Sequence, residues 1–156
     1  MKIINSGGDL NENIILEFEK QLGFTLPRMY RDFLMRNNGG TPEKNIIVNF
    51  VNNDGFNNNT DIKEFFELNT NSSDDKWDIM KGHKILTEQD HIPHNILAFA
   101  ENSGGDLICI SCTGDDCGKI YFWDHELDMQ AASYDNMSLI ANSFLEFIDK
   151  CNENVQ

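Results

Sequence analysis

Three cysteines and one histidine lie close enough in the chain to suggest a zinc site. Cys109, Cys112 and Cys117 follow one another, and His125 could supply a fourth ligand. A structural zinc ion needs four ligands that converge at about 2.0–2.3 Å, usually from turns. Cys109 and Cys112 instead fall on an expected strand, where residues three apart point to opposite faces. The sequence therefore favours small buried thiols, and we expect no bound metal.

Two other patterns resemble metal-binding motifs but lack a ligand or the right spacing. The stretch Asn52–Gly55 is similar to the centre of a calcium loop. If its glycine takes the sixth position of such a loop, Phe50 takes the first, where an oxygen ligand is needed. His91 and His94 are separated by Pro93, which prevents them from sharing one helical face. We interpret these residues as an Asn-rich turn and ordinary surface side chains.

The tetrapeptide 123–126 allows two interpretations. Its three ionisable residues, Asp124, His125 and Glu126, could form an acid–base cluster. They could equally mark the point where a core strand, with Trp123 buried, continues into a solvated loop. No serine or cysteine lies in a nucleophile-elbow context, and no pair of carboxylates stands out from the general acidity. We therefore expect no catalytic residue, no cofactor and no enzymatic activity.

Helices are predicted at both ends of the chain. Apolar residues recur at helical spacing over 10–22, and a second helix should begin at Pro27 and end before the glycines at 39–40. Helical spacing returns over 140–151. The expected N-caps are a capping box at 9–12 for the first helix and Asn136 or Ser138 for the last.

The middle of the chain is predicted to form a sheet. β-branched and aromatic runs, separated by turns rich in Gly, Asp and Asn, indicate antiparallel strands joined by hairpins. These strands are expected at 46–51, 96–100, 107–112 and 119–123, with polar loops at 52–60 and 69–75, a short helix at 61–66 and an unassigned piece at 77–80. The predicted fold class is α+β: a central, mainly antiparallel, twisted sheet with an N-terminal helix pair and a C-terminal helix packed on it, in one domain over 1–156.

One segment carries a specific motif. Residues 22–40 read LGFTLPRMYRDFLMRNNGG, which is similar to the LG-x-x-LP-x-x-Y-x-x-FL…NGG pattern that joins two N-terminal helices in the SUKH superfamily, the SMI/KNR type. Residues 99–106 and 118–126 resemble the central strands of that family, and 143–148 resembles its closing helix. Residues 52–83 match nothing in the family pattern, and we interpret them as an Asn-rich variable middle.

The resemblance implies a binding protein. Most family members are bacterial immunity proteins that bind and neutralise partner toxins, many of them nucleases, and this chain resembles that branch. Some fungal members are regulators that act as interaction hubs, so a signalling or scaffold adaptor with the same fold is the alternative. A small metal-dependent hydrolase would require the Cys, His and Asp side chains to converge.

Charge and composition restrict the partners further. The formal net charge is −14. Residues 1–44 hold as many bases as acids, so residues 45–156 carry the entire excess. Binding to nucleic acid depends on Lys and Arg, so this charge argues against a nucleic-acid partner. The longest apolar run, Ile96–Ala100, is far shorter than the ~20 residues of a membrane helix. Four cysteines without framework spacing favour the reducing cytoplasm.

The uneven charge can serve solubility alone, or it can form an electronegative face for a basic protein. Together with the resemblance, the second reading predicts a cognate protein toxin, a basic nuclease whose active site the chain occludes. The candidate face comprises a first cluster, Asp115, Asp116, Asp124, Glu126 and Asp128, and a second cluster, Asp74, Asp75 and Asp78. These loops could instead be merely solvated, with the partner bound elsewhere. The sequence does not predict the oligomeric state.

Overall fold

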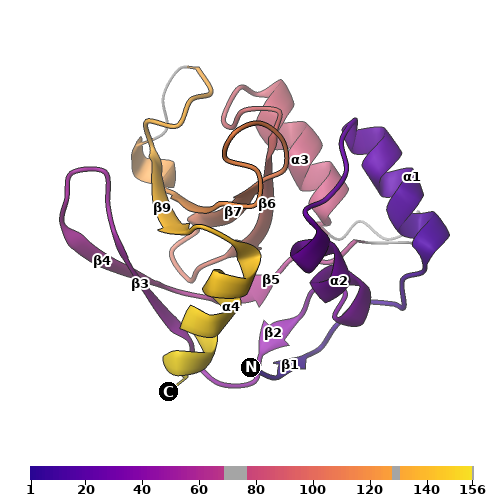
Figure 1. Cartoon of the computed structure of the whole chain (residues 1–156), viewed down its shortest axis with the longest axis horizontal. Helices are drawn as coiled ribbons and strands as arrows, with labels where there is room; N and C mark the ends of the chain where they lie inside the picture. The colour runs from indigo at the N-terminus through magenta and orange to yellow at the C-terminus, as the bar shows by residue number, and fades with distance from the viewer. Residues whose placement is uncertain (69–76, 128–130, 156) are drawn as a thin grey trace.

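The computed structural model describes residues 1–68, 77–127 and 131–155, which form an α+β fold (Figure 1). The helices are α1 (Glu12–Leu22), α2 (Arg28–Arg36), α3 (Ile79–Glu88) and α4 (Phe144–Glu153), with a 3₁₀ turn at His125–Leu127. The strands are β1 (Ile3–Ile4), β2 (Thr41–Pro42), β3 (Ile47–Val51), β4 (Asn57–Asp61), β5 (Glu64–Phe65), β6 (Ile96–Glu101), β7 (Leu107–Ser111), β8 (Ile120–Trp123) and β9 (Met137–Ala141).

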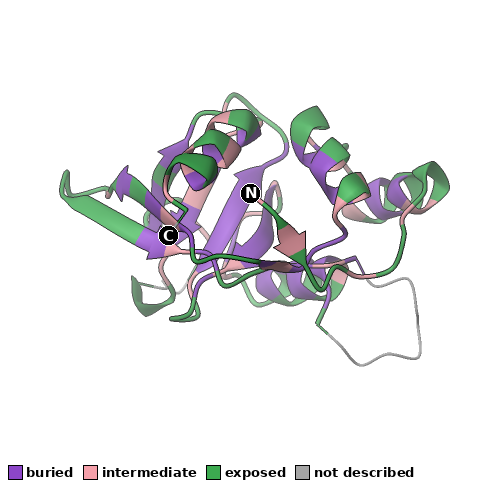
Figure 2. Cartoon of the chain, turned by 90° about the horizontal axis from the view of Figure 1, so that it is seen from below, coloured by how far each residue is buried: buried purple, intermediate pink, exposed green. Residues whose placement is uncertain are grey.

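The central sheet is antiparallel, with the strand order β5-β6-β7-β8-β9. Strand β7 and nearly all of β6 are buried, as expected for apolar runs at the middle of a sheet. The pairs β1–β2 and β3–β4 form two smaller sheets. The β3–β4 hairpin packs against the central sheet, where Phe50 contacts the Phe122 ring at 5.1 Å and Asn53 donates to the Met137 carbonyl, and most of β4 is exposed (Figure 2). This arrangement confirms the predicted fold class and the strands expected at 96–100, 107–112 and 119–123.

Helices α2 and α4 pack on one face of the sheet through aromatic rings. The Tyr30 ring of α2 lies 5.2 Å from that of Phe99 on β6 and 5.4 Å from that of Phe144 on α4. Phe147 approaches Phe99 edge-on at 5.6 Å. Such tilted and edge-on contacts add to the stabilisation from burial. Helices α2 and α4 therefore cover the same face of the sheet side by side (Figure 1). Helix α3 packs against β6.

The short helix predicted at 61–66 was wrong. Residues Glu64–Phe65 form strand β5, which pairs with β6 so that Phe65 is buried. The loop predicted at 52–60 was wrong in its second half, because β4 pairs with β3 along its whole length. A short run of mixed residues has no decisive periodicity. Strand pairing decided both cases, with the distant β6 for Glu64–Phe65 and with the neighbouring β3 for β4.

The helix boundaries also differ from the predictions. Asn11, rather than the box at 9–12, caps α1 by accepting the amide of Ile14 at 3.0 Å. The caps expected at Asn136 and Ser138 were wrong, because that segment enters β9 and Ser143 caps α4. Helix α3 begins within the unassigned piece at 77–80 and continues through residues for which the sequence predicts no element. The loop predicted at 69–75 lies outside the described residues. None of the described helices is long and apolar enough to cross a membrane.

Candidate functional site

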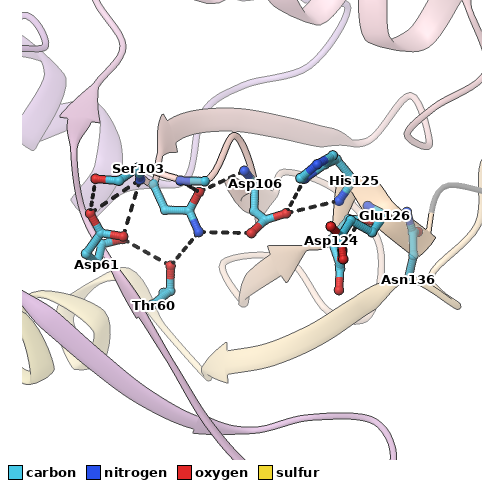
Figure 3. A network of polar contacts seen from close by, with 10 residues as sticks. Thr60, Asp61, Ser103, Asp106, Asp124, His125, Glu126 and Asn136 are labelled. Atoms are coloured by element: carbon cyan, nitrogen blue, oxygen red, sulfur yellow. Dashed lines mark hydrogen bonds and ion pairs between the residues drawn. The ribbon is translucent and has the colours of Figure 1, made fainter.

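Carboxylates from several segments gather at one end of the central sheet. The end is formed by the β4–β5 connection, the β6–β7 turn and the segment after β8, which the strand register places side by side. We call this surface the acidic edge and define it by Asp61, Glu64, Glu101, Asp106, Asp124 and Glu126. Figure 3 shows four of these residues joined by polar contacts or adjacent to them.

Asn102 holds the β6–β7 turn of the acidic edge in place. Its Oδ1 accepts the backbone amides of Gly104 and Asp106 at 2.9 and 2.8 Å. Its Nδ2 donates to Asp106 Oδ2 at 3.0 Å and to Thr60 Oγ1 at 3.2 Å. Ser103 donates its hydroxyl to Asp61 at 2.5 Å (Figure 3). The turn is therefore fixed to the end of β4, and its carboxylates have defined positions.

His125 and Asp106 form a pair at the outer side of the edge. The imidazole Nδ1 lies 2.6 Å from Asp106 Oδ1, which also accepts the His125 amide at 3.2 Å. The hydrogen bond to Asp106 raises the pKa of His125, and the charges of Asp106, Glu126 and Asp124 act in the same direction. A raised pKa favours the imidazolium, which is a poor general base. The pair therefore provides charge and geometry more readily than proton abstraction.

Asp106, Asp124 and His125 also have potential metal ligands within 4.8 Å of one another. They are the one such group found in the described part of the chain. Each of the three already has a partner in the chain, since Asp106 binds His125 and Asp124 Oδ1 accepts the amide of Glu126 at 2.9 Å. The absence of a metal stays a prediction.

The cysteines do not form a metal-binding group among the described residues. Cys109 is buried within β7, Cys112 is buried just after it, and Cys117 is exposed. Burial raises the pKa of both buried thiols far above its usual value, so these thiols stay protonated. His125 lies beyond the other end of β8 from Cys117. The prediction of small buried thiols is confirmed for Cys109 and Cys112 and was wrong for Cys117, which is exposed.

The predicted partner-binding residues differ in how available they are. Asp115 and Glu126 are exposed, whereas Asp116 and Asp124 are half-buried. Asp78 is 6% exposed, and its carboxylate caps α3 by accepting the amide of Lys81 at 2.7 Å. The remaining predicted residues, Asp74, Asp75 and Asp128, lie outside the described residues.

Asp116 is held by three hydroxyl groups. Ser111 donates to Oδ1 at 2.8 Å, and Tyr121 and Tyr134 donate to Oδ2 at 2.9 Å each. Burial alone would raise the pKa of Asp116, but the hydrogen bonds from Ser111, Tyr134 and Tyr121 outweigh it and lower the pKa. Asp116 thus orders the β7–β8 loop, and its neighbour Asp115 is the accessible charge of that loop.

The strand register divides the first predicted cluster into two. Asp115 and Asp116 precede β8, and Asp124 and Glu126 follow it. Four strand residues span about 13 Å, so the two pairs lie at opposite ends of the sheet. The residues that do accompany Asp124 and Glu126 were missed by sequence reasoning. Glu101 and Asp106 flank a Gly-rich turn between predicted strands, and this hairpin pattern could have placed both at the same end as Asp124.

Two comparisons bear on this chain. The model of the SMI1 / KNR4 family (SUKH-1) matches residues 9–150. The "SPbeta prophage-derived uncharacterized protein YokK" of Bacillus subtilis (strain 168) is 45% identical over 64 residues. That match covers 41% of this chain and 30% of the relative, so the similarity concerns less than a third of the relative's length.

Proposed function

The chain belongs to the SMI1 / KNR4 family (SUKH-1), and from that premise we propose that it is an immunity protein that binds and neutralises a cognate bacterial toxin. SUKH domains are associated with toxin binding in polymorphic toxin systems. The proposed partner is basic, with a nuclease as the favoured class, and the proposed location is the cytoplasm. The chain would act by occupying the toxin's substrate channel.

The acidic edge is the observation that carries this proposal. Its carboxylates come from β4, β5, β6 and the segments next to β7 and β8, so the fold rather than one local run concentrates the charge. Among the described residues of the edge, Lys63 binds Glu101 at 2.6 Å and His125 binds Asp106 at 2.6 Å. The substrate channel of a nuclease is lined with Lys and Arg side chains that bind phosphates. A fixed array of carboxylates is complementary to such a channel, and clustered charge also accelerates the encounter.

The chemistry of the edge supports binding without catalysis. His125 is exposed and paired with Asp106, which favours its protonated form. The hydroxyl of Ser103, the serine of the β6–β7 turn, donates to Asp61 and not to the imidazole. The edge thus contains no activated nucleophile among the described contacts, and we propose that neutralisation is stoichiometric.

Co-expression tests the function. The probe is the product of the gene immediately upstream, tested as the candidate toxin in a bacterial host with and without the chain. We expect the chain to restore growth and to form a stoichiometric complex with a toxin variant that lacks activity. Growth restoration without a complex, or protection at amounts far below the toxin, would contradict a binding mechanism and indicate catalysis.

Charge reversal tests the face. The double variant Glu64→Lys/Glu126→Lys reverses two exposed carboxylates of the edge. Its matched control, Asp32→Lys/Asp149→Lys, makes the same charge change on exposed positions of α2 and α4. We expect the edge variant to slow association by about tenfold or more and to reduce its salt dependence.

Asp115→Lys is a third variant, at the opposite end of the sheet, and it tests the β7–β8 loop separately. Asp116 is left unchanged because reversal would break its hydrogen bonds to Ser111, Tyr121 and Tyr134. Equal effects of the edge variant and its control, with both folded, would show that the acidic edge is not the binding face.

A further inference from the structure

We infer that a cavity beside the acidic edge receives an arginine side chain of the protein partner; this inference rests on the proposed function. The cavity has a volume of about 530 Å³. Its lining combines glutamates with two tryptophans, which is the composition suited to a flat cation. We call it the edge cavity, and its lining includes Glu64, Glu67, Glu101, Leu107, Trp77 and Trp123.

The floor of the edge cavity is one row of residues across the sheet. Glu64 is the register partner of Glu101, Glu101 of Leu107, and Leu107 of Trp123. Residues directly opposite one another in antiparallel strands place their side chains on the same face. The floor therefore changes from two carboxylates at β5 and β6 to an apolar and aromatic surface at β7 and β8.

The two carboxylates of the floor form an unfavourable pair. Like charges directly opposite in neighbouring strands destabilise a sheet. Lys63 binds Glu101 at 2.6 Å, and the charge of Glu64 also helps to raise the pKa of Lys63. Within the described chain, however, the exposed Glu64 carboxylate makes no hydrogen bond or ion pair of its own. A cation between the two strands would relieve the repulsion. A guanidinium has the donor geometry to engage carboxylates with two parallel hydrogen bonds.

The wall of the cavity contains a fixed but exposed indole. Trp77 is 45% exposed and meets the Phe66 ring edge-on at 6.1 Å. It lies against α3 at Gly82, where an added Cβ would come within 2.5 Å of the indole. Glycine in a helix interior is less stable than alanine by about 1 kcal/mol. The missing side chain of Gly82 thus leaves space for Trp77 against α3. The rest of the indole surface remains exposed and accessible to a ligand.

Aromatic and acidic groups favour arginine over other occupants. A guanidinium is planar and weakly hydrated, so it stacks on an indole while its edge binds carboxylates. An apolar side chain would bury the glutamates without a partner, which is unfavourable. An acidic side chain would be repelled by them. The edge cavity therefore matches an arginine inserted from a basic partner.

The test uses N-acetyl-arginine amide as the probe, with N-acetyl-citrulline amide as an uncharged control of nearly the same shape. Binding is followed by NMR of the indole N–H signals of Trp77 and Trp123. We expect the arginine probe to shift these signals with a dissociation constant in the millimolar range and the citrulline probe to leave them unchanged. Glu64→Gln and Trp77→Ala should each weaken binding at least about fivefold, whereas Asp32→Asn on α2 should not.

Each outcome separates the inference from the proposed function. Equal shifts with both probes, or no shift of either indole, would overturn the arginine site even if the chain binds its toxin. Shifts specific to arginine in a chain that binds no toxin would support the cavity and contradict the proposed function. Because Trp77→Ala removes a contact with Phe66, the exposed Glu64→Gln variant is the decisive one if the tryptophan variant does not fold.

Discussion

Removal of a single hydroxyl group, in the variant Tyr30→Phe, should stabilise the protein. Tyr30 is 1% exposed, and its ring packs against Phe99 and Phe144. Its Oη has no hydrogen-bond partner among the described residues. Burial raises the pKa of this phenol far above its usual value, so the hydroxyl remains protonated. The folded state therefore contains a buried hydroxyl that water satisfies only after unfolding.

The magnitude follows from that lost hydration. Burial of an unpaired hydroxyl costs about 1–3 kcal/mol on protein-derived scales. Phenylalanine keeps every ring contact and removes only this cost. We therefore expect Tyr30→Phe to raise the free energy of unfolding by ~1–2 kcal/mol. In a chain of this length, the melting temperature should then rise by roughly 3–6 °C.

Tyr121→Phe is the matched control, because it removes the same atom from a paired site. The Tyr121 hydroxyl donates to Asp116 at 2.9 Å, and hydrogen bonds to charged groups contribute about 1.5–3 kcal/mol. Asp116 keeps its bonds from Ser111 and Tyr134, so we expect a loss of ~1–2 kcal/mol. Urea unfolding followed by tryptophan fluorescence measures both variants. The same curves test the expected single domain over 1–156, which should unfold in one transition.

The essential result is that the free energy of unfolding rises in Tyr30→Phe and falls in Tyr121→Phe. If Tyr30→Phe lowers the free energy of unfolding by more than about 0.5 kcal/mol, the Tyr30 hydroxyl has a hydrogen-bond partner in solution, for instance a buried water. That result would refute the unpaired hydroxyl. If both variants are stabilised, the Tyr121–Asp116 bond does not hold the β7–β8 loop. Unchanged urea dependence of the free energy in both variants is required for either conclusion.

Three further changes test individual positions by the same unfolding assay. Gly39→Ala should cost at least ~2 kcal/mol, because residue 39 has φ +66° and an added Cβ would lie 2.6 Å from the Glu67 backbone nitrogen; a neutral result would contradict this geometry. Asp78→Ala should cost about 1 kcal/mol and Asp78→Asn much less, because only alanine removes the α3 cap. Burial lowers the pKa of His83 from 6.5 to about 4. Its contribution to stability is therefore present above pH 6.5 and is lost as the pH falls towards 4. Over this pH range the free energy of unfolding should fall more in the wild type than in His83→Leu. His125 acts in the opposite sense, since its raised pKa contributes stability below 6.5 that disappears as the pH rises through the folded pKa.

The fold was predictable where local signals and distant pairing agree. The runs at 96–100, 107–112 and 119–123 are strand-forming and separated by turn residues, and they form β6, β7 and β8. Residues 61–66 combine Ile and Phe with Asp, Lys and Glu, so helix and strand are both compatible with the sequence. Only the pairing of Phe65 with Ala100 decides between them. That pairing is not a local property, and no periodicity reveals it.

The candidate site was predictable only in part, for the same reason. The acidic excess after residue 44 indicated an electronegative surface, but charge counting cannot group residues in space. Asp115 and Glu126 seemed to form one cluster because both lie in one stretch of sequence, yet β8 separates them. Glu64 lies far from Glu101 in sequence and opposite it in the sheet. A face composed of several strand ends can be seen only once their register is known.

The edge cavity contains two departures from the rules that govern stable folds. Glutamates face each other at register partners Glu64 and Glu101, and a glycine occupies the interior of α3 beside Trp77. A neutral residue at either glutamate would remove the first departure. Alanine at position 82 would remove the second only if Trp77 moved away from α3, because an added Cβ would lie 2.5 Å from the indole. A sequence selected for stability alone would be consistent at both positions. Both departures border the same cavity, one supplying its charge and the other positioning its aromatic wall, and binding of a cationic partner explains them together.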